Sequence, residues 1–199
     1  MTTPFSVIGK RVVVVGAARS GIAAAQLLVR RGAKVTLSDV RPSLPESREL
    51  EAGGISLELG GHTLPTFTNV DLVVMSPGVP ARQPAIDAAR AAGATVIGEL
   101  ELACRWLSGR IVAITGTKGK STTTTLAGRM LEAGGLKVLV GGNIGNALSA
   151  QVDQSTPDTI HVIETSSFQL EAIETFRPWV AVLLNFSPDH LDRHATIEA

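Results

Sequence analysis

The stretch Ile111-Val-Ala-Ile-Thr-Gly-Thr-Lys-Gly-Lys-Ser-Thr122 carries the strongest structural signal, because an apolar run ends in a glycine-rich loop and a helical segment follows. The run predicts a buried strand, and a Gly-x-x-Gly-Lys-Ser loop points its backbone N–H groups inward around phosphate groups. Lys120 adds a cation for the β- and γ-phosphates, and Ser121 offers an oxygen to Mg²⁺. The strict pattern has glycine where this chain has Ile114, so the loop is a variant. We expect ATP phosphates to bind at Gly116, Thr117, Lys118, Gly119, Lys120, Ser121 and Thr122.

Polar side chains follow other apolar runs of the same half of the chain. Glu164 comes directly after the run 159–163, and Asn143 lies in Gly141-Gly-Asn-Ile-Gly145 after another run. The segment Asn185-Phe-Ser-Pro-Asp-His-Leu-Asp-Arg-His194 follows the last run, and its histidines and aspartates are typical of a metal or phosphate site. Glu164 is either the acid that holds a metal or a buried carboxylate paired with Lys120. Lys118 is either a second phosphate contact or a solvated lysine.

A second glycine-rich turn, Val15-Gly-Ala-Ala-Arg-Ser-Gly21, also follows an apolar run and opens a helical segment. The dinucleotide fingerprint has three glycines, and its middle one is replaced here by Ala18. Asp39 stands near the acidic position of that fingerprint, and Arg41 is placed to meet a phosphate or a ribose. The alternatives are a tight turn that binds nothing and an Asp39 that only caps a turn. Ser76-Pro-Gly78 follows a further run, where either a ligand edge or an ordinary turn is expected.

Short apolar runs alternate with helical segments along the whole chain. This rhythm predicts an α/β fold with parallel sheets, a Rossmann-like domain at 1–98 followed by a P-loop ATPase-like domain at 99–199 that is incomplete. Ser20 to Arg31 places Ile22, Ala25, Leu28 and Val29 on one helical face, and Ser121 to Ala133 does so with Leu126, Met130 and Leu131. The expected strands are 11–15, 34–38, 71–75, 94–97, 111–115, 137–140, 159–163 and 179–184.

Composition excludes several kinds of protein. The 18 basic residues balance the 18 acidic ones, so no overall positive charge favours nucleic acid or an anionic membrane. Hydrophobic residues make up 44% of the chain, which is enough for a packed core. No early apolar run is long enough to span a bilayer, and the start lacks the regions of a signal peptide. We expect a cytoplasmic monomer that binds neither nucleic acid nor membrane.

Four strings together resemble the Mur ligases, the ATP-dependent amide ligases of peptidoglycan synthesis. They are Gly116-Thr-Lys-Gly-Lys-Ser121, Gly141-Gly-Asn-Ile-Gly145, Glu164-Thr-Ser-Ser-Phe-Gln-Leu-Glu171 and Leu184-Asn-Phe-Ser-Pro-Asp-His-Leu-Asp-Arg193. The second and third strings indicate the branch that adds D-glutamate to UDP-N-acetylmuramoyl-L-alanine. The resemblance implies a UDP-sugar site at Arg19, Ser20, Asp39, Val40, Arg41, Ser76, Gly78 and Asn143. It implies ATP phosphates at Lys120, and Mg²⁺ at Ser121, Glu164 and His190, with Lys120, Glu164 and His190 as the catalytic residues.

The resemblance also has departures and rivals. Lys118 stands where the family usually has asparagine, and His194 where many members have tyrosine. A C-terminal ligase domain and a modified lysine that helps to hold the second metal are expected beyond these 199 residues, so we expect this chain alone to be inactive. The alternatives are a UDP-sugar-binding module without catalysis, an NAD-dependent oxidoreductase that uses the Gly16 turn, and a sibling ligase that adds another amino acid.

Overall fold

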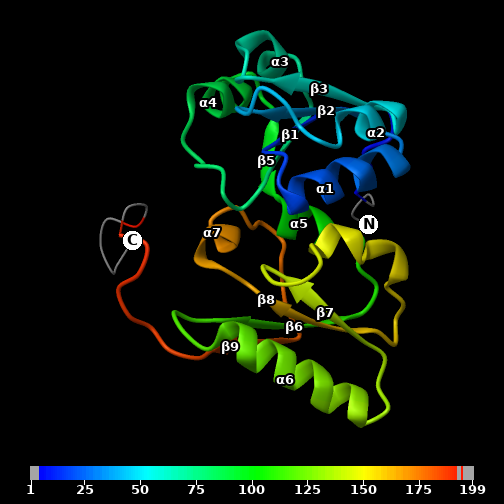
Figure 1. Cartoon of the computed structure of the whole chain (residues 1–199), viewed down its shortest axis with the longest axis vertical. Helices are drawn as coiled ribbons and strands as arrows, with labels where there is room; N and C mark the ends of the chain where they lie inside the picture. Colours follow the sequence, from blue (N-terminus) through cyan, green and yellow to red (C-terminus); the bar gives the residue numbers. More distant parts are fainter. Residues whose placement is uncertain (1–4, 192–193, 195–199) are drawn as a thin grey trace. The chain divides into compact units, whose positions relative to one another are not determined.

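The structure is a computed structural model that describes residues 5–191 and residue 194 (Figure 1). In chain order the elements are β1 Arg11–Val15, α1 Arg19–Arg30, β2 Lys34–Asp39, α2 Ser47–Ala52, β3 Ile55–Leu59, α3 Leu64–Thr68, β4 Leu72–Met75, α4 Pro84–Ala91, β5 Thr95–Gly98, α5 Glu99–Cys104, β6 Arg110–Thr115, α6 Lys120–Ala133, β7 Val138–Gly142, the 3₁₀ turns η1 Leu148–Ala150 and η2 Val152–Gln154, β8 Ile160–Glu164, α7 Ser167–Leu170 and β9 Val180–Leu183. The predicted α/β class is confirmed.

The first sheet has the strand order β3-β2-β1-β4-β5, and all its neighbouring strands are parallel. Val12 and Val14 of β1 pack with α1, α2 and α5 on one face. Val13 and Val15 pack with α3 and α4 on the other face. The β1 run is continuously apolar because both faces of its strand are covered by helices, as Figure 1 shows for this sheet.

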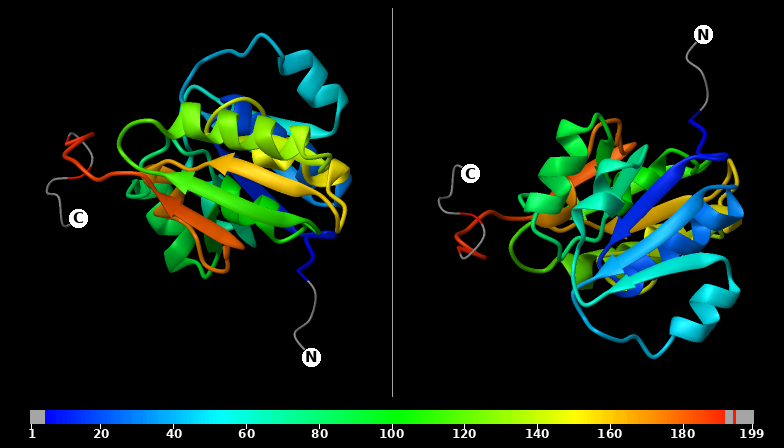
Figure 2. Two further views of the ribbon diagram at one scale, coloured as in Figure 1. Left: turned by 90° about the horizontal axis from the view of Figure 1, so that it is seen from below. Right: turned by 90° about the horizontal axis from the view of Figure 1, so that it is seen from above.

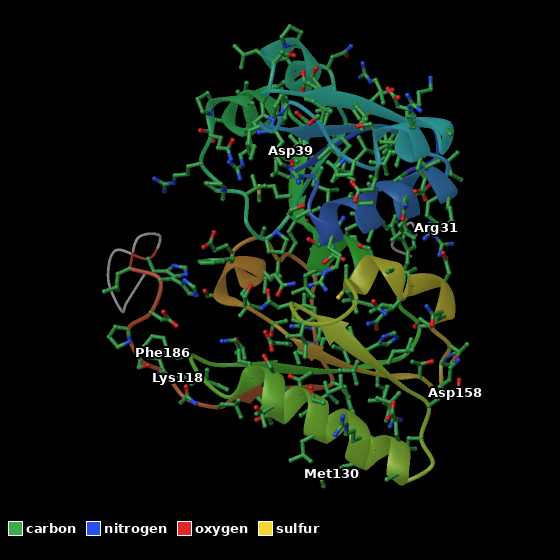
Figure 3. All side chains as sticks on the ribbon, in the orientation of Figure 1. Arg31, Asp39, Lys118, Met130, Asp158 and Phe186 are labelled. Atoms are coloured by element: carbon green, nitrogen blue, oxygen red, sulfur yellow. The ribbon has the colours of Figure 1, made fainter. Side chains whose placement is uncertain are left out.

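The second sheet has the order β7-β8-β6-β9, again with parallel neighbours. Helix α6 lies along one face of it (Figure 2). The predicted helix is confirmed, but the expectation that Leu126 and Met130 face the core is wrong. Both side chains are exposed, and Figure 3 shows Met130 on the outer side of α6. Thr124 and Gly128 are the buried residues of this helix, because small side chains let α6 approach β7 closely.

The remaining expectations for the first sheet differ in outcome. The predicted face of α1 is confirmed, because Ala25 and Leu28 are buried and Ile22 and Val29 pack against the same core. Strand β3 was not expected from the sequence. Its residues alternate instead of forming an apolar run, and it is the edge strand of the sheet.

The chain separates into two compact units. Unit 1 contains the described residues up to Trp106 together with Ala147–Asp153 and Phe168–Phe176. Unit 2 contains Leu107–Asn146, Gln154–Ser167 and the described residues from Arg177 onward. The division expected from the sequence, at residues 98 and 99, remains a prediction. No helix of the described part of the chain is long and apolar enough to cross a membrane.

Candidate functional site

In unit 2, β6 leads through the glycine-rich loop directly into α6. Gly116 has φ +138°, and Gly119, which precedes the first residue of α6, has φ +83°. Such angles favour glycine over any residue that carries a Cβ atom. The loop therefore turns sharply and presents the first N–H groups of a 14-residue helix, which is the geometry of an anion-binding loop.

The Lys120 side chain folds back over this loop. Its Nζ donates hydrogen bonds to the carbonyl oxygens of Gly116 at 2.7 Å and Thr117 at 3.0 Å. The ammonium group is thus held at the loop, while the side chains of Lys118 and Thr122 are exposed. A cation fixed by two neutral carbonyls keeps its full charge for an anionic ligand.

Ser121, Asn143 and Glu164 meet at the carboxyl end of the second sheet. Ser121 Oγ donates to Glu164 Oε2 at 2.6 Å, and Asn143 Nδ2 donates to Glu164 Oε1 at 2.7 Å. The Asn143 N–H also donates to the main-chain oxygen of Glu164 at 2.9 Å. Glu164 is only 2% exposed, and the structure pairs its carboxylate with these two side chains rather than with Lys120. The structure therefore brings these three residues together.

His190 lies in the exposed segment that follows β9. Its φ is +51°, and its N–H donates to Asp189 Oδ1 at 2.9 Å. Within the described residues, no group of three or more histidine, cysteine, aspartate or glutamate side chains is arranged to hold a metal. His194 Nε2 lies 2.9 Å from Ser167 Oγ, whereas Asp192 and Arg193 lie outside the described residues. The role of His190 as a metal ligand stays a prediction.

In unit 1, the Gly16 turn joins β1 to α1 at the carboxyl end of the first sheet. Gly16 has φ +89°, and a Cβ atom there would lie 2.8 Å from Val79 Cγ2. Ser76 is buried, and its Oγ donates to the Gly16 carbonyl at 2.8 Å. Of the other expected UDP-sugar residues, Ser20 is half-buried, whereas Arg19, Val40 and Gly78 are exposed around this edge.

Asp39 and Arg41 stabilise the Gly16 turn through hydrogen bonds. Asp39 Oδ2 accepts the Ala17 N–H at 2.5 Å and Arg41 Nη2 at 3.0 Å, while Oδ1 accepts the Arg41 N–H at 2.8 Å and Nε at 2.9 Å. Arg41 Nη2 also donates to the Ala17 carbonyl at 2.8 Å. The Arg41 side chain lowers the pKa of Asp39 far below the usual range, and the two N–H groups add to this against the opposing effect of burial. Four donors of the protein form hydrogen bonds with the two oxygens of Asp39. Asp39 therefore stabilises the turn, and its carboxylate is not available to a ribose.

Asn185 also contacts the glycine-rich loop 116–121, although no sequence pattern points to this residue. Asn185 Oδ1 accepts the Lys118 N–H at 2.9 Å, and its Nδ2 donates to the Lys118 carbonyl at 2.9 Å. Figure 3 shows Lys118 and Phe186, the neighbour of Asn185, in the same region of unit 2. The available signal was its position two residues after β9, the strand that pairs with β6.

A Rossmann-like sheet and a second parallel sheet with a glycine-rich strand–helix loop define an α/β protein whose two sheets are typical of nucleotide-binding proteins. The particular family follows from two family models. Residues 10–98 match the N-terminal domain of MurD-like Mur ligases, and residues 114–199 match the Mur ligase middle domain. The chain belongs to the Mur ligase family.

Similar proteins agree with this assignment. A UDP-N-acetylmuramoylalanine--D-glutamate ligase of Acidobacterium capsulatum is 52% identical over 193 residues, which are 96% of this chain and 42% of that protein. The enzyme of the same name from Koribacter versatilis is 51% identical and is covered to 43%. The chain thus spans less than half the length of these relatives. A UDP-N-acetylmuramate:L-alanyl-gamma-D-glutamyl-meso-diaminopimelate ligase from Neisseria meningitides matches with a TM-score of 0.60 at 23% identity, covering 96% of this chain and 64% of that one. At that identity the last likeness concerns the fold alone.

Proposed function

We propose that this chain is the N-terminal and middle part of an ATP-dependent ligase of peptidoglycan precursor synthesis. The complete enzyme joins D-glutamate to UDP-N-acetylmuramoyl-L-alanine and forms ADP and phosphate. Relatives of that name match 96% of the chain at 51–52% identity, which supports this substrate pair over those of sibling ligases. ATP and UDP-sugars are cytoplasmic compounds, so the enzyme works in the cytoplasm.

The observation that carries the proposal is the cluster at the carboxyl end of the second sheet. Lys120 is held over the glycine-rich loop, and Ser121 and Asn143 both donate to the buried Glu164. A loop of N–H donors, a lysine and a carboxylate placed next to a hydroxyl are the parts that phosphoryl transfer from a nucleotide requires. An ordinary strand–helix turn needs none of these polar side chains.

The reaction has two steps. A carboxylate oxygen of the L-alanyl group attacks the γ-phosphorus of ATP, and the bond between that phosphorus and the β–γ bridging oxygen breaks to release ADP. The amine of D-glutamate then attacks the acyl phosphate, loses a proton and expels phosphate, so that an amide forms. Two polyanions approach each other in the first step, and the charge of Lys120 together with the loop N–H groups offsets their repulsion.

The donor set of the loop fits Mg²⁺. Ser121 Oγ and Glu164 Oε2 are hard oxygen ligands only 2.6 Å apart, on elements that both end at the loop. These two residues would hold the ion, and His190 is proposed for a second ion by its place in the family motif. When bound, Mg²⁺ neutralises charge on the transferred phosphoryl group. Asn143 keeps the Glu164 carboxylate in place from its other oxygen.

Unit 1 supplies the UDP-sugar site in this proposal. The Gly16 turn offers the N-terminal N–H groups of α1 to a diphosphate, and Arg41 adds a cation that is half exposed. The engaged oxygens of Asp39 argue against a dinucleotide whose ribose hydroxyls need that carboxylate.

Calorimetric titration of the 199-residue chain tests the proposal. We expect binding of UDP-N-acetylmuramoyl-L-alanine and of Mg·ATP, and no binding of NADH. Lys120→Ala should weaken Mg·ATP binding roughly 10- to 100-fold, as expected for the loss of a charged hydrogen-bond donor. The matched control is Lys137→Ala, because Lys137 lies in the same unit and its Nζ donates to the Gln154 carbonyl and to Thr156 Oγ1, away from the glycine-rich loop.

Each outcome has a distinct meaning. Binding of NADH without the UDP-sugar would replace the ligase with an oxidoreductase. Binding of the UDP-sugar without Mg·ATP would favour a sugar-nucleotide-binding module. Equal affinity of Lys120→Ala and the wild type for Mg·ATP would remove the phosphate loop from the proposed site.

A further inference from the structure

The Asn185 side chain forms hydrogen bonds with both the N–H and the carbonyl of one residue of the glycine-rich loop, Lys118. Its Oδ1 accepts the Lys118 N–H and its Nδ2 donates to the Lys118 carbonyl, both at 2.9 Å. Its main-chain oxygen accepts the Thr117 N–H at 3.2 Å. One side chain therefore fixes the two peptide groups on either side of Lys118, and the adjacent main chain fixes a third.

The neighbouring residues extend this contact. Thr117 Oγ1 donates to the Ser187 carbonyl at 3.0 Å and accepts the Ser187 N–H at 3.0 Å. A Cβ atom on Gly116 would lie 3.1 Å from both the nitrogen and the main-chain oxygen of Asn185. The glycine at 116 thus permits a close approach between the loop and the segment after β9.

From this geometry we propose that Asn185 is a positioning residue, which holds the phosphate loop in the shape that binds the ATP phosphates. The inference rests on the proposed function, because it assigns the loop to ATP. Both hydrogen bonds of the Asn185 side chain go to main-chain atoms of Lys118. The loop is therefore held whatever side chain stands at 118, which explains how lysine is accepted where the family usually has asparagine.

The amide group suits this task better than other side chains. It presents an acceptor and a donor in one plane, which match the N–H and the C=O of a single residue. Aspartate would keep the acceptor but turn a second oxygen toward the Lys118 carbonyl. Alanine would leave both groups to water, since this part of the loop is exposed.

The test compares Asn185→Ala with the wild-type 199-residue chain by Mg·ATP titration and by amide hydrogen exchange in the absence of nucleotide. We expect about tenfold weaker binding, corresponding to two lost hydrogen bonds, and about tenfold faster exchange at the Lys118 amide. The melting temperature should change little, so a general loss of structure would not account for the result. Asn69→Ala is the matched control, because Asn69 also makes a side-chain hydrogen bond, with Arg11 in unit 1. It should leave Mg·ATP affinity unchanged.

The outcomes separate the inference from the function on which it rests. Wild-type affinity in Asn185→Ala would overturn the inference and leave the proposed function standing. Absence of Mg·ATP binding by the wild type would overturn both. If the alanine variant melts well below the wild type, Asn185→Asp carries the test. It should protect the Lys118 amide yet bind Mg·ATP more weakly, and wild-type affinity in that variant would overturn the inference.

Discussion

Replacing Glu101 by glutamine should strongly destabilise unit 1. Glu101 is fully buried on α5, and its Oε2 accepts three consecutive main-chain N–H groups, those of Glu174, Thr175 and Phe176, at 2.9, 2.9 and 3.0 Å. Its Oε1 accepts from Thr175 Oγ1 at 2.5 Å and from Arg105 Nε at 2.9 Å. The carboxylate therefore holds the segment 168–176 within the unit, and a neutral amide would hold it less well.

The size of the effect follows from the pKa of Glu101. Burial alone would raise this pKa, but the hydrogen bonds from Thr175, from the Glu174 and Thr175 N–H groups and from Arg105 lower it to about 2, against an ordinary value of 4.5. A shift of this size corresponds to about 3 kcal/mol of folding free energy. Because the pKa is lower in the folded state, this stability is present above pH 4.5 and is lost as the pH falls toward 2.

Urea unfolding at several pH values measures this contribution. The difference in unfolding free energy between the wild type and Glu101→Gln should be about 3 kcal/mol at pH 7 and should fall below half of that at pH 3. Glu99→Gln is the matched control, with the same change on the same helix. Glu99 is fully buried and accepts the Ser149 N–H at 2.7 Å, and burial raises its pKa.

The control should respond in the opposite direction. Because the pKa of Glu99 is higher in the folded state, its contribution is present below pH 4.5 and is lost as the pH rises through the folded value. The stability of Glu99→Gln relative to the wild type should therefore increase as the pH rises above 4.5. A Glu101→Gln variant whose difference from the wild type stays constant between pH 7 and pH 3 would refute the reasoning, as would equal behaviour of the two variants.

Three further predictions concern the two glycine turns and α6. Asp39→Asn should weaken UDP-N-acetylmuramoyl-L-alanine binding roughly tenfold in calorimetry, because the carboxylate that binds Arg41 and the Ala17 N–H is lost. Unchanged affinity would contradict the role of Asp39 in stabilising the Gly16 turn. Gly128→Ala should lower the unfolding free energy by about 1–3 kcal/mol in urea, since a Cβ atom there would lie 2.3 Å from Val140 Cγ2, whereas the exposed Arg129→Ala should change little. Ser121→Ala should reduce the gain in ATP affinity that Mg²⁺ provides, and a variant with the full gain would place the ion elsewhere.

Much of the fold could be predicted because strand burial leaves a local mark. Val12 to Val15 pack alternately on the two faces of the first sheet, so every position of that strand is apolar. Strand β3 carries a different pattern, because apolar and polar residues alternate from Ile55 to Leu59 as in a half-buried strand, and a search for apolar runs does not find it. Its Glu58 is accommodated by hydrogen bonds from Ser38, Thr63 and Thr66, which lower the pKa of the carboxylate against the effect of burial. These hydrogen-bond donors lie outside β3, so the sequence of the strand itself does not predict them.

Helix α6 shows a different limit. Its large apolar residues recur at helical spacing, and periodicity alone assigns them to the core. The structure packs the helix through Thr124 and Gly128 and leaves Leu126 and Met130 exposed. The spacing identified the helix correctly, but which face packs depends on how closely the sheet approaches, and that distance is set by Val140 and Val138 opposite Gly128.

The candidate site could be predicted where it depends on topology, and not where it depends on hydrogen-bond partners. Parallel strands end at one edge, so Ser121, Glu164 and Asn143 had to converge once the strands were known. The partners of Asp39 and Asn185 follow only from three-dimensional distances. These two residues show that similar strand–glycine–helix turns are stabilised by different chemistry. The first turn depends on a carboxylate and a guanidinium, which acid weakens, whereas the second depends on a neutral amide that does not titrate. The low pKa of Asp39 moves that weakening to strongly acidic solution.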